Sequence, residues 1–129
     1  MTLPQKKILI ADDDLAICES LQLMLQEDNY VVSTTQDGGM LSRLGKDMPD
    51  LILLDVWMSG HDGSHICREL KLREATKHIP VILMSARRDI AEIATAALAD
   101  DYLAKPFSMR DLLAKVEHSL TRHEHTKNI

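Results

Sequence analysis

The sequence predicts an α/β domain built on a doubly wound parallel sheet, with strands and helices alternating along the chain. Short runs rich in leucine and β-branched residues recur, and segments long enough for helices separate them. Runs such as "LILLD" and "PVILM" are almost wholly apolar instead of alternating between apolar and polar positions, which indicates strands that are buried on both faces. A parallel sheet between two layers of helices has this pattern, so five strand–helix repeats are the simplest arrangement.

The predicted strands are "KILIA", "YVVST", "LILLD", "PVILM" and "DYLAK", at positions 7–11, 30–34, 51–55, 80–84 and 101–105. Helices follow four of these strands, marked by apolar residues at helical spacing: Ile17, Leu21, Met24 and Leu25; Ile66 and Leu70; Ile90, Ile93 and Ala97; Leu112, Val116 and Leu120. The segment 37–46 is the weakest helix, because Gly38 and Gly39 fall in its first turn.

The last helix begins at Ser108, which forms a capping-box pattern with Asp111. We expect this helix to fray in the polar segment "TRHEHTKNI". One domain over residues 1–122 and a polar tail over 123–129 are therefore expected.

Composition narrows the class of protein. The 129 residues, 45% hydrophobic and 27% charged, suit one globular domain. No apolar run reaches the roughly 18 residues of a membrane span, and the N-terminus lacks a secretory pattern, so a cytoplasmic protein is expected. Cys18 and Cys67 lack the spacing of a metal site and are expected as reduced thiols. A net charge of -5 argues against direct binding to nucleic acid or an anionic membrane.

Polar residues stand where the predicted strands end, and the carboxyl ends of parallel strands share one edge of the sheet. These residues are Asp12 and Asp13, Asp55, Ser85, and Lys105 followed by Pro106. Each alone has an ordinary explanation, such as a polar turn or a surface charge. Their joint placement at one edge favours a site for a hard cation and a phosphoryl group, because Mg²⁺ prefers carboxylate oxygens and bridges to phosphate.

Three consecutive acidic residues, Asp12 to Asp14, need an explanation, since two like charges about 4 Å apart cost roughly 4 kcal/mol at an effective dielectric near 20. We interpret Asp12 and Asp13 as a metal-binding pair. Asp14 is interpreted as the cap of the following helix, where its carboxylate meets unpaired N–H groups.

From Lys7 to about Arg122, the chain resembles the receiver domain of bacterial two-component response regulators, in the small CheY-like form. The resemblance rests on "ILIADDD", "DLILLDVWMSGHDG", "VILMSA" and "ADDYLAKPF". It implies a flavodoxin-like fold of strand order 2-1-3-4-5. It also implies a signalling phosphoacceptor instead of an enzyme, one that promotes its own phosphorylation and dephosphorylation.

The resemblance implies that Asp55 takes a phosphoryl group from a phosphohistidine of a sensor histidine kinase or a histidine phosphotransfer protein. A short-lived aspartyl phosphate results. Asp13 and Asp55, with the backbone carbonyl of Trp57, would bind Mg²⁺ directly, while Asp12 helps through bound water. This scheme agrees with the chemistry of phosphoryl transfer, which depends mostly on positioning and charge stabilisation.

The same resemblance assigns contacts and a switch. Lys105 and the Ser85 hydroxyl would contact the phosphoryl oxygens. Ser85 would move toward the phosphoryl group, and Tyr102 would turn inward behind it. A downstream protein partner would then bind the surface of the fourth helix, fifth strand and fifth helix, roughly residues 87–120.

Three positions depart from the family pattern. Ser59 stands where the family usually has proline, which predicts a less rigid turn. Leu98 stands where glycine is common, which bears on the turn before Asp100. Trp57 is large and close to Asp55, so it would either shield the aspartyl phosphate from water or contact a partner.

Other classes fit less well. "LILLD" resembles the Walker B strand of a P-loop NTPase, but "SRLGKD" lacks the phosphate-binding spacing. A flavodoxin-like FMN binder shares the architecture, yet the acidic residues 12–14 would repel its phosphate. An interaction-only pseudo-receiver is disfavoured because the phosphorylation residues are retained. A receiver portion of a larger regulator or hybrid kinase stays open.

The histidines invite a metal or phosphorelay interpretation. His61 with His65, and His123 with His125, have ligand-like spacing. Without a fourth ligand or an apolar setting, we interpret all four as surface residues.

Overall fold

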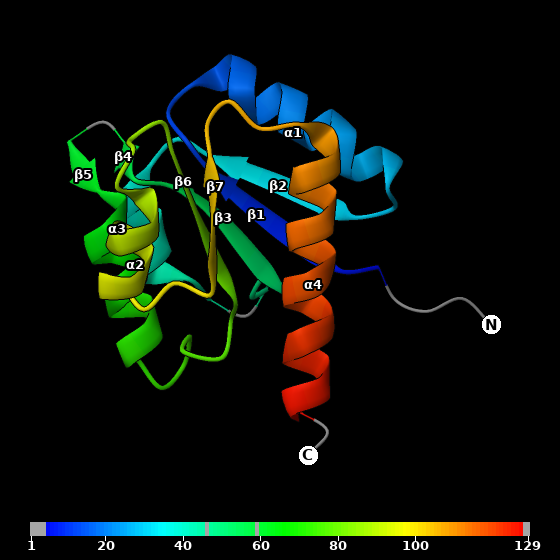
Figure 1. The fold of residues 1–129 in the computed structure, drawn as a ribbon. Helices are drawn as coiled ribbons and strands as arrows, with labels where there is room; N and C mark the ends of the chain where they lie inside the picture. The colour runs from blue at the N-terminus through cyan, green and yellow to red at the C-terminus, as the bar shows by residue number, and fades with distance from the viewer. Residues whose placement is uncertain (1–4, 46, 59, 128–129) are drawn as a thin grey trace.

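A five-stranded parallel sheet forms the centre of the computed structural model, which describes residues 5–45, 47–58 and 60–127 (Figure 1). Its spatial order is β2-β1-β3-β6-β7. The strands are β1 (Lys7–Ala11), β2 (Val31–Thr35), β3 (Leu51–Asp55), β6 (Val81–Ser85) and β7 (Asp101–Ala104). A separate antiparallel hairpin pairs β4 (Trp57–Met58) with β5 (His61–Asp62). The predicted fold and strand order are confirmed, since β6 and β7 are the fourth and fifth strands of the sheet.

Helices cover both faces of the sheet, as Figure 1 shows. They are α1 (Leu15–Glu27), the 3-10 helix η1 (Gly38–Arg43), α2 (Gly63–Leu72), α3 (Ile90–Ala96) and α4 (Met109–Lys127). One apolar cluster joins the sheet to α1 and α4, and a second joins it to η1, α2 and α3. The two clusters explain the continuous apolar strands, because successive side chains of β3 enter opposite layers.

Some element boundaries differ from the sequence prediction. The segment 37–46 forms only the short η1, whose cap Asp37 accepts a hydrogen bond from the Gly39 amide at 2.9 Å. The hairpin β4–β5 was not predicted, and β7 ends at Ala104, one residue early. The α4 backbone continues to Lys127, into the segment expected to fray, so the domain boundary at 122 remains a prediction.

Two predicted caps are present. Asp14 is the N-cap of α1 and accepts from the Ile17 amide at 3.2 Å. Before α4, the Ser108 hydroxyl accepts from the Asp111 amide at 3.1 Å. Cys18 and Cys67 are both buried and free of disulfides, as expected. Within the described residues, no helix is long and apolar enough to cross a membrane.

Leu98, two residues after the end of α3, has an unusual backbone conformation, with φ of 64°. Its amide bonds the Thr95 carbonyl, and the Ala99 amide bonds the Ala94 carbonyl, which together make a Schellman motif. Asn29 occupies the same place after α1, with φ of 70°. The turn in question at Leu98 therefore keeps a geometry that normally favours glycine or asparagine, with a leucine side chain in it.

Candidate functional site

Acidic side chains gather at the carboxyl edge of the sheet. Asp12 and Asp13 follow β1, and Asp55 ends the neighbouring β3. Each of the three offers a carboxylate oxygen, and these oxygens lie within 4.8 Å of one another. In the part of the chain that the structure describes, this is the one group of three such ligands found. The sequence placed these residues at one edge, and the structure brings them together.

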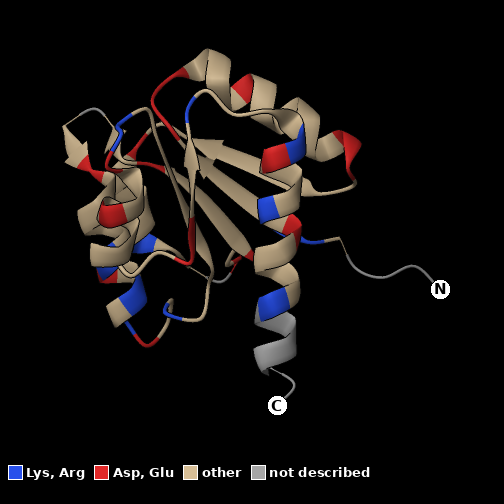
Figure 2. Cartoon of the chain, in the orientation of Figure 1, with Lys and Arg blue, Asp and Glu red and all other residues tan. Residues whose placement is uncertain are grey.

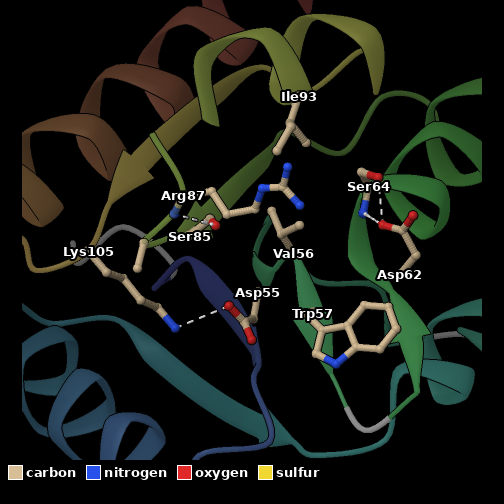
Figure 3. Close-up of a pocket in the computed structure, with 10 residues that line it drawn as sticks. Asp55, Val56, Trp57, Asp62, Ser64, Ser85, Arg87, Ile93 and Lys105 are labelled. Atoms are coloured by element: carbon tan, nitrogen blue, oxygen red, sulfur yellow. Dashed lines mark hydrogen bonds and ion pairs between the residues drawn. The ribbon is translucent and has the colours of Figure 1, made fainter. Parts of the chain in front are cut away.

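Lys105 lies among these carboxylates. Its Nζ donates to Asp12 Oδ2 at 2.9 Å and to Asp55 Oδ1 at 3.1 Å, the latter drawn in Figure 3. The side chains of Asp12 and Asp55 are only 1% and 14% exposed, so the ammonium neutralises carboxylates that water screens poorly. A buried carboxylate without such a partner would be strongly destabilising.

The pKa values of this cluster follow from burial and charge. Burial, reinforced by repulsion from Asp12, raises the pKa of Asp55 above its ordinary value, although Lys105 opposes the rise. Burial acts to lower the pKa of Lys105, but its bonds to Asp12 and Asp55 outweigh that effect and raise it. Lys105 is therefore a permanent cation beside a carboxylate that the fold makes easier to protonate.

Asp12 is held from several sides. Its Oδ1 accepts from the Asp14 amide at 2.9 Å, while its Oδ2 accepts from Lys105. The Cys18 thiol donates to the Asp12 backbone carbonyl at 3.2 Å, and burial is the main cause that raises the pKa of this thiol. Asp13, in contrast, is exposed. The two neighbours thus differ in how freely they can meet a cation from solution.

Ser85 ends β6 and is buried, with 6% of the residue exposed. Its Oγ accepts a hydrogen bond from the Arg87 amide at 3.0 Å. The hydroxyl proton is not used in that bond, so it remains available to an acceptor in the site.

A cavity of about 670 Å³ opens beside Asp55 (Figure 3). It is lined by Asp55, Val56, Trp57, Asp62, Ser64, Ser85, Ala86, Arg87, Ile93 and Lys105. The Trp57 side chain stands at its edge, and the residue is 63% exposed. Asp62 caps α2 by accepting from both the Ser64 amide, at 2.9 Å, and the Ser64 hydroxyl, at 2.6 Å.

Sequence reasoning missed three polar lining residues, Asp62, Ser64 and Arg87. Asp62 and Ser64 carry a recognisable signal, a capping pattern before an apolar helix face. Arg87 carries only a weak one, its place just after a strand end. Ser59 lies outside the described residues, so the prediction about its turn is untested.

Tyr102 lies on β7, away from the carboxylates, and its half-buried ring packs against the cluster that includes α3. Lys115 of α4 places its Nζ 4.4 Å from the ring centroid. The same ammonium donates to Asp101 Oδ1 at 3.1 Å and to the Tyr102 carbonyl. The Lys115 ammonium thus makes a cation–π contact with the ring.

The histidines do not join a metal-binding cluster in the described chain. His65 pairs with Glu69 at 2.9 Å on the surface of α2, and His61 is exposed on β5. The side chains of His123 and His125 lie outside the described residues.

The fold and the acidic edge define a doubly wound sheet protein with a cation-compatible site at the ends of its central strands. A family model for the response regulator receiver domain matches residues 8–117. The chain therefore belongs to the receiver domains of two-component response regulators.

Known proteins agree with this assignment. The response regulator MprA of Mycolicibacterium vanbaalenii is 40% identical over 119 residues, covering 90% of this chain and 51% of the relative. The chain spans about half the length of the curated relatives it matches. A solved CheY-like receiver domain protein from Methanospirillum hungatei is 29% identical, with a TM-score of 0.84 over 95% of this chain and 99% of that one.

A second solved structure is the signal receiver domain of a signal transduction histidine kinase from Syntrophus aciditrophicus. It is 31% identical, with a TM-score of 0.82 and coverage of 90% of each chain. Similar domains therefore occur both in response regulators and within a histidine kinase.

Proposed function

We propose that Asp55 is the phosphoacceptor of this receiver domain and that it takes its phosphoryl group from a phosphohistidine. The observation that carries the proposal is the contact of Asp55 with Lys105 beside two further carboxylates. Phosphoryl transfer needs a positioned nucleophile, a cation near the transferred oxygens and little else from the protein. The Asp55 carboxylate, at the end of a buried strand and 14% exposed, is both positioned and reachable.

Asp55, Lys105 and Ser85 are the only groups of this protein that the transfer step needs to balance. One carboxylate oxygen of Asp55 attacks phosphorus, and the bond from phosphorus to the donor nitrogen breaks. The electron pair of that bond stays on the imidazole, and an aspartyl phosphate forms. Lys105 would follow the charge onto the phosphoryl oxygens, and the Ser85 hydroxyl would donate its unused proton to one of them.

The cluster of Asp12, Asp13 and Asp55 carboxylates fits Mg²⁺, which prefers oxygen ligands and keeps several waters. Asp13 and Asp55 would hold the ion directly, together with the backbone carbonyl of Trp57. Asp12 would act through water, which is supported by its two oxygens already accepting hydrogen bonds. When bound, the ion supplies neutralisation of the charge on the phosphoryl oxygens.

Partners follow from the same proposal. A sensor histidine kinase or a histidine phosphotransfer protein would donate the phosphoryl group, and the domain would act as a cytoplasmic signalling phosphoacceptor. A downstream protein would bind the surface of α3, β7 and α4, the elements that begin within residues 87–120. The alternative is that the receiver forms part of a longer regulator, and the greater length of its curated relatives supports it.

A small phosphodonor tests the proposal without any kinase. We expect Mg²⁺ with acetyl phosphate to add one phosphoryl group to the wild-type chain, seen by intact-mass spectrometry. Asp55→Asn should gain none, and Asp50→Asn, which changes a carboxylate at the opposite end of β3, should gain as much as wild type. A wild-type chain that gains no phosphoryl group would favour the interaction-only pseudo-receiver.

A further inference from the structure

Arg87 is a cationic side chain of the cavity that the proposed function does not use. It lies just beyond β6, and its backbone amide is the group that bonds the Ser85 hydroxyl. Figure 3 shows its side chain extending across the cavity toward Ile93, on the far side of Ser85 from Lys105. The guanidinium therefore borders the same space as the Asp55 carboxylate without being bonded to it.

An ion pair holds Arg87 in this position. Its Nε donates to Asp89 Oδ1 and its Nη2 donates to Asp89 Oδ2, both at 3.0 Å. The two side chains are 65% and 50% exposed. Exposed ion pairs of this kind contribute little to stability, because water and salt screen them. The Arg87 guanidinium can therefore leave Asp89 for a stronger partner at a small cost in free energy.

The charges at the carboxyl edge of the sheet predict the chemistry of a stronger partner for Arg87. The unphosphorylated site groups three carboxylates, and one ammonium bonds two of them. Phosphorylation of Asp55 would replace its single negative charge by about two. Among the described residues that line the cavity, Lys105 and Arg87 are the basic ones. A planar guanidinium presents paired N–H donors that match phosphoryl oxygens, a better fit than the point charge of an ammonium.

We propose that Arg87 is a second cationic ligand of the phosphoryl group and that Asp89 restrains it until Asp55 is phosphorylated. This inference rests on the proposed function of Asp55. Transfer of the guanidinium from Asp89 to the phosphoryl oxygens exchanges a screened surface pair for a charge-assisted contact beside a buried group.

The exchange also has a consequence for α3. Asp89 is the residue before this helix, yet its carboxylate makes no capping hydrogen bond while Arg87 holds it. Once released, that carboxylate can accept from the first amides of α3. The phosphoryl group would in this way affect the helix that borders the proposed output surface.

Two variants with opposite expected effects test the inference, using beryllofluoride as the phosphoryl mimic. Binding to the Mg²⁺-saturated chain would be followed by amide shifts in NMR titrations. Arg87→Gln should weaken binding by about three- to thirtyfold, because a charge-assisted contact is lost. Asp89→Asn should tighten binding by about two- to fivefold, because the restraint on Arg87 is removed.

The controls separate this inference from a structural role. Arg88→Gln removes a neighbouring charge that does not line the cavity and should leave the affinity unchanged. The double variant Arg87→Gln/Asp89→Asn should bind no more tightly than Arg87→Gln. Unchanged affinity in Arg87→Gln, or weaker binding in Asp89→Asn, would overturn the inference. A wild-type chain that binds no beryllofluoride would instead overturn the proposed function itself.

Discussion

The first residue of α2, Gly63, lies against the backbone of Asp55 so closely that an added Cβ would come within 2.0 Å of the Asp55 carbonyl oxygen. The Gly63 amide also donates to the Val56 carbonyl. Backbone cannot yield as a flexible side chain can, so only glycine fits here without moving one of the two segments. The close packing of the start of α2 against the Asp55 backbone therefore helps to fix the position of the proposed phosphoacceptor.

Gly63→Ala should consequently lower both stability and phosphorylation. We expect the free energy of unfolding to fall by about 1–3 kcal/mol, as in other overpacked sites, and the rate of labelling by acetyl phosphate to fall with it. Urea denaturation and mass spectrometry measure the two effects. Gly45→Ala is the matched control, because a Cβ at Gly45 meets nothing within 4 Å. Equal stability of the two variants would refute the packing argument.

Leu98→Gly should stabilise the protein. Leu98 holds a positive φ in an exposed turn, a conformation that costs an L-residue roughly 1–2 kcal/mol and glycine little. Allowing for the greater flexibility of glycine in the unfolded chain, we expect a net gain of about 0.5–1 kcal/mol in the free energy of unfolding.

Leu23→Gly provides the opposite case for comparison. Leu23 is an exposed residue inside α1, where glycine costs about 1 kcal/mol relative to good helix formers. Thermal or urea unfolding of both variants should therefore give shifts of opposite sign. A loss of stability in Leu98→Gly would mean that its side chain contributes more than its backbone costs.

Mg²⁺ binding should be visible in the fluorescence of Trp57, the one tryptophan of the chain. Its exposed ring borders the cavity beside Asp55. Asp13→Ala should abolish the change, because too few charged ligands remain for a cation that dehydrates reluctantly. At a concentration about 100 times the dissociation constant, the ion should also stabilise the wild type by about 2.7 kcal/mol. A titration unaltered in Asp13→Ala would place the metal elsewhere.

Stability should depend on pH through Asp55. Its pKa is raised in the folded protein, chiefly by burial, so folding favours the protonated carboxyl and the ionised form costs stability at neutral pH. Asp55→Asn should therefore be more stable than wild type at pH 7. That advantage should shrink as the pH falls through the raised pKa toward the ordinary value of an aspartate.

Asp62 should show the opposite dependence of stability on pH in the same experiment. The Ser64 hydroxyl lowers the pKa of Asp62, so its ionised form stabilises the fold above its ordinary pKa. Asp62→Asn should be less stable than wild type at pH 7, with the deficit disappearing in acid. Urea titrations from pH 7 down to about pH 2 would measure both differences, because the deficit of Asp62→Asn disappears only below the ordinary pKa of an aspartate. Parallel curves for the two variants would contradict the assignment.

Beryllofluoride should produce amide shifts at 85–88 and around Tyr102 as well as at Asp55. Only a state that brings Ser85 onto the phosphoryl oxygen gains the new hydrogen bond, and the ring of Tyr102 would turn inward behind it. That movement would separate the ring from Lys115, which now lies 4.4 Å from its centroid. Lys115→Met should therefore enlarge the shifted fraction at subsaturating beryllofluoride. Shifts confined to the carboxylate edge would mean that the protein binds without switching.

Much of the fold could be predicted because it depends on local pattern. Continuous apolar runs such as "LILLD" predicted buried parallel strands, and the capping role of Asp14 followed from its place before an apolar helix face. The carboxylates met at one edge because parallel strands share their direction. The short η1 was harder, since Gly38 and Gly39 weaken a helix without specifying its replacement.

The contacts that the sequence did not predict join residues far apart in the chain. The cation of Lys115 over Tyr102 depends on where α4 crosses the sheet edge, which no spacing in the sequence specifies. The hairpin β4–β5 had a local signal, Gly60 between short apolar and polar segments, but two-residue strands are too short for periodicity. Arg87 was overlooked because its place just after a strand end does not specify that its side chain lines the cavity.

The direction of α4 has a practical consequence for attaching this domain to other molecules. The helix begins near the carboxyl edge of the sheet and runs to the opposite end of the domain, so the end of α4 lies far from the acidic edge (Figure 1). In Figure 2, acidic and basic segments of the chain are coloured near that edge, at the opposite end of the domain from the end of α4. A fluorescent fusion or a surface tether joined after α4 should therefore leave access for a phosphodonor unobstructed, which suits the domain to immobilised binding assays.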